Sequence, residues 1–306
     1  MARARSENFP VASLALPRRA RAHLLAVYGF ARLVDEIGDA PPRGDAPARG
    51  DAPASAGAGA SAPRSPAERL AALDRLEREL DRALEGRAAS SPHAQHPLLV
   101  RLGETARACA LTREPFARLI EANRADQRVS RYQTWQQLRG YCALSADPVG
   151  ELVLQILGLA TPERIALSDS ICTALQLIEH CQDVAEDLAR GCVYLPQEDL
   201  ARFGCTEADL AQAHAGAPLR AVLAFELARA NGLLDDGLAL VAQLHGRPKL
   251  AVAAYLAGGR AAADAIERAG CDVLAGPPRA GRARRLAALA ATLRDARSAS
   301  RRSASR

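Results

Sequence analysis

The sequence has few residues of several types, and each shortage excludes a class of protein. Aromatic residues make up 4% of the 306 residues, and Lys249 is the only lysine. No apolar run approaches the ~18 residues that span a bilayer, and the first residues lack the apolar core of a signal peptide. The seven cysteines form no C-x-x-C pair, which argues against a zinc site and a disulfide framework. We therefore expect reduced thiols in a cytoplasmic protein.

The net charge of +5 is concentrated at one end of the chain. Residues 279–306 hold nine arginines and one aspartate, a charge of +8, which leaves −3 for the rest. A mildly acidic body lacks the basic stripe of a nucleic-acid-binding protein, so no nucleic acid is expected as a partner. Residues 279–306 are read as a basic tail. It is either a disordered end that aids solubility or a segment that lies on anionic lipid at the inner face of the membrane.

Alanine, leucine and arginine are abundant, and they recur with a helical period. The spacing predicts helices after Pro17 and over 67–84, 97–125, 130–159, 166–191, 207–243 and 248–275, with a kink near Asp147–Pro148. No segment alternates as a strand does. Residues 40–66 consist mainly of Pro, Gly, Ala and Ser, which predicts a flexible low-complexity insertion. We therefore expect one all-α domain over residues 1–278.

Two pairs of aspartates occur in otherwise apolar helical segments. Asp35 and Asp39 lie in the stretch FARLVDEIGD, and Asp183 and Asp187 lie in CQDVAEDLARG. Carboxylates four residues apart share one face of a helix and repel by roughly 0.2–0.5 kcal/mol. One such pair is typical of a solvated helix surface. Asp126 is likewise read as a capping or ion-pair residue.

Each pair continues a polar stripe along its helix. The stripes step by 4, 3 and 4 residues and consist of Tyr28, Arg32, Asp35 and Asp39 and of Gln176, His180, Asp183 and Asp187. Facing stripes would need cations between their carboxylates. Mg²⁺ is suitable because it takes oxygen ligands and is commonly held by one or two carboxylates plus substrate phosphates. A di-iron bundle needs Glu-x-x-His, and no histidine here has a Glu three residues before it.

Five ordered blocks resemble the squalene/phytoene synthase family and span about residues 6–275. They are NFPVASLALP, VYGFARLVDEIGD, RYQTWQQLRGYCALSADPVG, LQLIEHCQDVAEDLARGCVYLPQEDL and AGGRAAADAIERAGCDVL. The opening block and SADPVG are most similar to the hydroxysqualene synthase branch of bacterial hopanoid pathways. The resemblance implies an isoprenoid-synthase helical bundle around a central cavity.

The resemblance also implies roles for individual residues. The implied catalytic Mg²⁺ ligands, which bridge to the substrate diphosphate, are Asp35, Asp39, Asp183 and Asp187. The implied substrate contacts are Tyr28, Arg32, Gln176, Glu179, Gln182 and Tyr255, with Ser6, Asn8 and Phe9 in a segment that caps the diphosphate. Tyr141 is implied as a catalytic residue that lines the lower cavity with Tyr255, where aromatic rings stabilise a carbocation. His180 is read as a polar neighbour of the stripe.

The activity implied is the Mg²⁺-dependent conversion of presqualene diphosphate to hydroxysqualene, through ionisation, carbocation rearrangement and capture by water. No nicotinamide is expected, because this reaction needs none. A related alternative is head-to-head condensation of two prenyl diphosphates to presqualene diphosphate, squalene or phytoene. An alternative of another class is a catalytically inactive, membrane-associated binding or assembly protein. Glu179 in place of the usual Asn and Cys192 in place of a base favour the inactive protein, and the four aspartates with Arg32 disfavour it.

Overall fold

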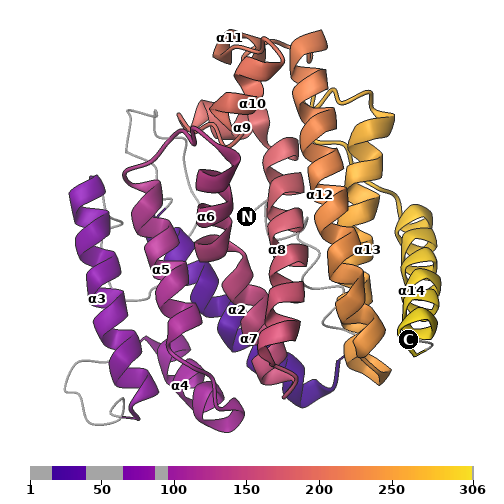
Figure 1. The fold of residues 1–306 in the computed structure, drawn as a ribbon. Helices are drawn as coiled ribbons and strands as arrows, with labels where there is room; N and C mark the ends of the chain where they lie inside the picture. The colour runs from indigo at the N-terminus through magenta and orange to yellow at the C-terminus, as the bar shows by residue number, and fades with distance from the viewer. Residues whose placement is uncertain (1–15, 39–64, 87–95, 305–306) are drawn as a thin grey trace, which may run out of the picture.

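The structure, a computed structural model, describes residues 16–38, 65–86 and 96–304 (Figure 1). Within these ranges every regular element is a helix, and the only β contact is an isolated bridge between Arg131 and Val193. The prediction of an all-α fold is confirmed. None of the described helices is both long enough and apolar enough to cross a membrane.

Most of the helices follow the segments expected from the sequence, and two, over 197–202 and 282–304, lie outside them. Their bounds are α2 Arg18–Gly38, α3 Pro66–Leu84, α4 Pro97–Cys109, α5 Glu114–Asp126, α6 Trp135–Ser145, α7 Asp147–Ile156, α8 Pro162–Gln182, α9 Val184–Ala189, α10 Gln197–Arg202, α11 Glu207–Leu210, α12 Ala217–Gln243, α13 Gly246–Arg268 and α14 Arg282–Ala304. Ser65 caps α3 in a capping box with Glu68, so Ser65 and Pro66 belong to the helix start rather than to the expected insertion. Most of that insertion, residues 40–64, lies outside the described residues.

Local breaks divide four of the expected long helices, and the one within 166–191 falls at Asp183. Ala110 takes a left-handed conformation (φ 51°) that ends α4, so 97–125 is two helices. The break between Ser145 and Asp147 confirms the predicted kink. The prediction of one helix over 207–243 is wrong, because α11 ends at Leu210 and α12 begins only after Gly216. A proline in the first turn of α12 is compatible with a helix start and not with a helix interior.

The disordered alternative for the basic tail is wrong for residues 282–304, which form α14. Figure 1 shows this helix lying along α13 at the edge of the bundle. Thr292 and Ala296 are fully buried, and Leu289 and Leu293 pack against the core formed with α12 and α13. The arginines of this segment therefore lie on an amphipathic helix whose apolar face is covered.

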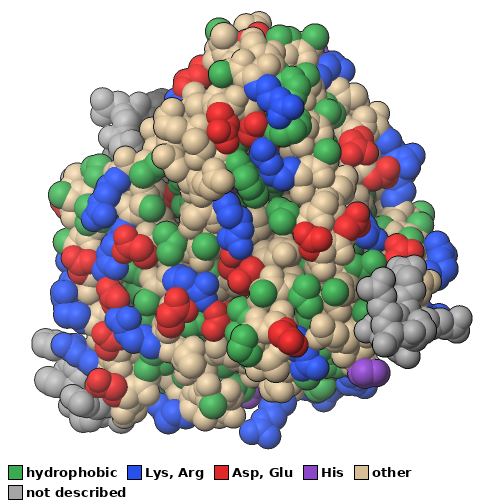
Figure 2. Space-filling view, in the orientation of Figure 1, with side chains coloured by type: hydrophobic (Ala, Val, Ile, Leu, Met, Phe, Trp, Pro, Cys, Tyr) green, Lys and Arg blue, Asp and Glu red, His purple; other side chains and the backbone are tan. Residues whose placement is uncertain are grey.

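Two large apolar clusters form most of the core of the bundle. One joins α2, α3, α4 and α5, and Phe30 and Phe116 meet edge to face at its centre with ring centroids 5.3 Å apart. The larger cluster joins α6, α8, α12 and α13. Leu152 of α7 belongs to the first cluster, and α7 packs closely on α8. On the face drawn in Figure 2, acidic and basic side chains are interspersed rather than gathered by sign.

Candidate active site

A cavity of about 630 Å³ lies among the helices of the bundle. Side chains of α2, α5, α6, α7, α8, α9, α12 and α13 line it, together with the start of α14. Its size is within the range of sites that enclose small molecules and cofactors. Ten of the residues singled out from the sequence line this one cavity, and they are Tyr28, Arg32, Asp35, Tyr141, Gln176, Glu179, Gln182, Asp183, Asp187 and Tyr255.

Helix α2 forms the first wall. Tyr28, Arg32 and Asp35 line the cavity, as the 4- and 3-residue spacing of the stripe predicts. Glu36, the next residue, is exposed and is not part of the lining. The fourth member of the stripe, Asp39, lies outside the described residues, as do Ser6, Asn8 and Phe9.

The end of α2 is held in place by contacts with α3 and α5. The Gly38 carbonyl accepts hydrogen bonds from Arg69 Nη1 at 3.3 Å and from Gln127 Nε2 at 3.1 Å. Asn123 Nδ2 donates to Asp35 Oδ1 at 3.4 Å. A Cβ atom on Gly38 would lie 2.0 Å from Asn123 Oδ1, so the close approach of the two helices requires glycine at this position.

Helices α8 and α9 form the second wall. Gln176, Glu179, Asp183 and Asp187 line the cavity from this side, and the Asp187 side chain is buried. The expectation that both aspartates lie on one continuous helix is wrong, because α8 ends at Gln182 and α9 begins at Val184. The Asp187 N–H still donates to the Asp183 carbonyl at 2.8 Å, so the two side chains keep the spacing of one helical turn across the break.

Three arginines that the sequence did not assign to the site also line the cavity. Arg190 contacts Asp187 at 3.9 Å and Glu186 at 2.6 Å. Arg279 and Arg285 come from the segment that was read as a tail. No local pattern distinguishes them from the other arginines there, and their place follows from the packing of α14. Gln182 Nε2 donates to the Pro278 carbonyl at 3.0 Å and ties this segment to the end of α8.

An aromatic and polar group lies between α5, α6 and α8. The rings of His180 and Tyr194 stack with centroids 4.1 Å apart, and Gln176 Nε2 lies 3.3 Å from His180 Nε2. Tyr141 donates its hydroxyl hydrogen to Asp126 Oδ2 at 3.1 Å, and Tyr194 donates to Asp126 Oδ1 at 3.4 Å. The capping or ion-pair interpretation of Asp126 is therefore replaced by that of a cavity residue that binds two tyrosines.

The tyrosines of this group are held as neutral donors. Burial is the largest cause that raises the pKa of the Tyr141 and Tyr194 hydroxyls, and the Asp126 carboxylate raises both further. Sequence reasoning missed Tyr194 and Asp126. Their closeness to Tyr141 in the folded chain identifies them, and no residue spacing along a single helix encodes that closeness.

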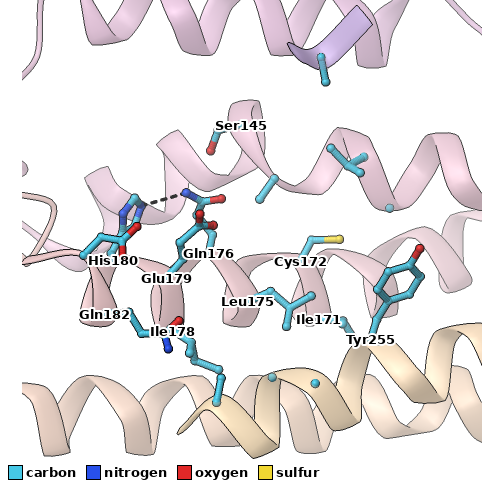
Figure 3. Close-up of a pocket in the computed structure, with 18 of the residues that line it drawn as sticks. Ser145, Ile171, Cys172, Leu175, Gln176, Ile178, Glu179, His180, Gln182 and Tyr255 are labelled. Carbon is cyan, nitrogen blue, oxygen red and sulfur yellow. Dashed lines mark hydrogen bonds between the residues drawn. The ribbon is translucent and has the colours of Figure 1, made fainter. Parts of the chain in front are cut away.

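The other end of the cavity is apolar. Figure 3 shows Ile171, Cys172 and Leu175 of α8 with Tyr255 of α13 at this end, and Glu179 and His180 at the other. Burial raises the pKa of the Cys172 thiol to about 12 and also raises the pKa of the Tyr255 hydroxyl, so both stay neutral. Tyr141 thus lies with His180 and Tyr194, away from Tyr255.

The carboxylates of the two walls suit a hard cation bound together with a substrate. They belong to Asp35, Glu179, Asp183 and Asp187. Among the described residues, no group of three or more His, Cys, Asp or Glu side chains converges on a point that could hold a metal ion. Mg²⁺ needs no such cage, since it is commonly held by one or two carboxylates, waters and substrate phosphates. The oxygen donors present fit that mode of binding.

Comparison with known proteins gives a consistent result. The model of the squalene/phytoene synthase family matches residues 2–289. Hydroxysqualene synthase from Zymomonas mobilis is 30% identical over 240 residues, which cover 78% of this chain and 71% of that protein. The enzyme of that name from Sinorhizobium fredii is 33% identical over 243 residues, which cover 78% and 72%. The crystal structure of squalene synthase HpnC from Alicyclobacillus acidocaldarius superposes with a TM-score of 0.71 at 42% identity, over 86% of this chain and 89% of that one.

Proposed function

Because the chain belongs to the squalene/phytoene synthase family, we propose that it converts presqualene diphosphate to hydroxysqualene with Mg²⁺ as the cofactor. The observation that carries the proposal is the single cavity with carboxylates from two walls at one end and apolar side chains at the other. A diphosphate with a long prenyl tail has the same division between a charged head and an apolar body. The names of the relatives from Zymomonas and Sinorhizobium support this reaction over others in the family.

The residues that would hold Mg²⁺ are Asp35, Asp183 and Asp187, with Asp39 as the fourth from its spacing. When bound, the ion neutralises the developing charge on the leaving diphosphate. Glu179 adds a carboxylate to the same region. We expect its negative charge to repel a bare diphosphate and to attract cations. Binding of the diphosphate at this end of the cavity should therefore depend on Mg²⁺.

Arginine side chains would bind the diphosphate itself. Arg32 projects from the first wall, Arg190 from the second, and Arg279 and Arg285 from the segment that α14 brings to the cavity. Cys192 cannot act as a cationic partner, but these arginines supply the positive charge that Cys192 does not. Guanidinium groups suit phosphate because they donate two parallel hydrogen bonds.

The apolar end of the cavity would hold the prenyl chain and keep bulk water from the carbocation. The C–O bond breaks with its electron pair on the diphosphate, the cation rearranges, and one water forms the new C–O bond. The proton released passes to the diphosphate, so the balance is presqualene diphosphate plus water to hydroxysqualene plus diphosphate. The ring of Tyr255 at this end and the ring of Tyr141 toward the other end line the cavity and would stabilise the cation by ~0.5–2 kcal/mol each.

A second candidate is head-to-head condensation of two prenyl diphosphates. The 42% identity to squalene synthase HpnC favours it. The same cavity would then take two diphosphates.

Contact with an anionic membrane stays a prediction. Helix α14 keeps Arg294 and Arg297 exposed on the side away from the core. We expect these arginines, rather than Arg279 and Arg285, to meet anionic lipid.

The test is incubation of the purified protein with Mg²⁺ and no NADPH, with presqualene diphosphate and farnesyl diphosphate in separate reactions. Mass spectrometry identifies the products. A C30 alcohol from presqualene diphosphate supports the proposal. Consumption of farnesyl diphosphate supports condensation, and a diphosphate that binds without being consumed supports the inactive protein.

A further inference from the structure

We propose that Asp126 is a positioning residue that acts through Tyr141 and Tyr194 to orient the water that captures the carbocation. The inference rests on the proposed function, because it concerns the step that makes the product an alcohol. It assigns this outcome to a group on the side of the cavity formed by α5 and α6, next to the second wall, where His180 Nδ1 lies 3.9 Å from Asp187 Oδ2.

The hydrogen bonds determine which way the two hydroxyl groups point. A carboxylate has no hydrogen to donate, so Asp126 accepts from Tyr141 at 3.1 Å and from Tyr194 at 3.4 Å. The two tyrosine hydroxyl groups also hydrogen-bond with each other, so both hydrogens are used within this group of three residues. Their high pKa values keep both hydrogens in place. All three residues line the cavity. The remaining lone pairs of the two phenolic oxygens are therefore the only hydrogen-bonding capacity that these tyrosines offer to other groups.

An oxygen that can only accept imposes an orientation on a water bound to it. The water must donate a hydrogen to the phenolic oxygen, so its own lone pairs point elsewhere. Such a water can attack an electron-poor carbon, whereas a water that accepts a hydrogen bond has one lone pair occupied. Capture forms one C–O bond, and the proton leaves for the released diphosphate, so Asp126 need not take it.

A further hydroxyl group on this wall calls for water or a ligand. The Ser145 Oγ is buried and has no hydrogen-bond partner in the described part of the chain. Buried polar atoms are rarely left unpaired, and ordered water is a common partner. Ser145 follows Tyr141 by one helical turn, lines the cavity and lies in Figure 3 on the side of α6 that faces Gln176. The wall around Asp126 is thus polar enough to hold one water.

The aromatic stack makes the arrangement rigid. Tyr194 is held between His180, at a centroid distance of 4.1 Å, and Tyr132, at 5.8 Å, with nearly parallel rings in both contacts. Tyr141 packs against the same rings at 5.3–6.3 Å. A hydroxyl group on a fixed ring needs no reorganisation when the cation forms. Removal of Asp126 should therefore change the direction of the hydroxyl groups more than the position of the rings.

The experiment compares D126N in two backgrounds, the natural chain and the Y141F/Y194F variant, with presqualene diphosphate and Mg²⁺. An amide of the same size can accept only at its oxygen and donates at its nitrogen, so it reverses one hydrogen bond. In the natural background we expect kcat to fall about 10–100-fold, KM to change less than about threefold and the product to shift from alcohol to hydrocarbon. In the Y141F/Y194F background, D126N should change kcat less than about twofold.

Y132F is the matched control, because Tyr132 belongs to the same stack but does not line the cavity and does not bind Asp126. We expect its product ratio to equal that of the natural chain, and D126E to restore part of the alcohol fraction. The single variants Y141F and Y194F test the same idea if D126N does not fold, and each should lower the alcohol fraction.

Two results would refute the inference alone: an equal loss from D126N in both backgrounds, or an unchanged product ratio in D126N, Y141F and Y194F. A natural chain that forms no alcohol from presqualene diphosphate refutes the proposed function itself, and the inference with it. The unsubstituted protein therefore separates the two failures.

Discussion

The two acidic walls of the cavity carry the same spacing of polar residues on different local structures. On α2 the described members of the stripe, Tyr28, Arg32 and Asp35, lie on one unbroken helix whose end is held by hydrogen bonds to the Gly38 carbonyl. On the opposite side the helix breaks at Asp183, and Asp187 is buried at the start of α9. The first wall thus depends on a neighbouring helix for its position, and the second depends on its own backbone.

The comparison shows that a D-x-x-x-D pattern predicts that the two side chains point to the same side. It does not predict whether the helix that carries them is continuous. Residues four apart point the same way in a continuous helix and, here, across a break that retains the 183–187 hydrogen bond. What differs is how each wall can be disturbed. The position of Asp35 can be altered from α5, whereas the second wall depends on its own backbone and on the core against which α8 packs.

The largest effect is expected when a wall loses charge. D35N and D187N should each lower kcat by about 10²–10³-fold, because each removes a carboxylate that balances the cations beside the diphosphate. The check is steady-state kinetics over a range of Mg²⁺ concentrations, with E36Q as the control on the exposed side of α2. If D35N keeps more than half of the activity while D187N is inactive, the walls do not share the ions.

The next effect concerns the core beneath the second wall. Glu226 of α12 is fully buried and binds Arg229, which also binds Asp199 at 3.0 Å. Burial is the main cause that raises the pKa of the Glu226 carboxyl to about 8. The folded state therefore binds a proton that the unfolded state releases near pH 4.5, so the stability that this group contributes falls as pH rises from about 4.5 to 8.

Urea denaturation at several pH values tests this dependence. The natural chain should lose up to about 1.4 kcal/mol per pH unit relative to E226Q within that window. If the free energy of unfolding changes with pH in the same way for the two proteins, Glu226 is ionised in the folded state.

A smaller effect is expected at the end of the first wall. G38A would place a Cβ 2.0 Å from Asn123 Oδ1 and should lower the free energy of unfolding by about 1–3 kcal/mol. The matched control is G232A on α12, where nothing lies within 4 Å of the added atom and helix propensity predicts a gain of up to about 1 kcal/mol. Equal changes in the free energy of unfolding of G38A and G232A would mean that α2 can move away from α5 without loss of stability.

The smallest effect is expected from the contact that orients Asp35. N123A removes the donor to Asp35 Oδ1 and should lower kcat/KM by about tenfold. In a D35N background the same change should have almost no further effect, because the partner charge is already absent. Additive losses in the double variant would place the role of Asn123 elsewhere, for example in its bond to the Leu119 carbonyl at 3.2 Å.

Much of this cavity could be predicted along single helices. Tyr28, Arg32 and Asp35 share a face by their spacing, and so do Gln176, Asp183 and Asp187, because the helical period is a local property. The helix break at Asp183 was missed, since its 183–187 hydrogen bond leaves the apolar period intact. The helix formed by 282–304 was also missed, because its many arginines favoured a solvated tail over its apolar face.

The amino-acid order alone determined that the chain is helical and that acidic stripes run along two of its segments, because backbone hydrogen bonds and side-chain direction depend on near neighbours. Only the tertiary structure decided that Asp126 meets Tyr141 and Tyr194, and that Arg279 and Arg285 reach the cavity. These groups lie on different helices, or on segments far apart in sequence. Which of them meet depends on how apolar faces pack, and packing is a property of the whole chain.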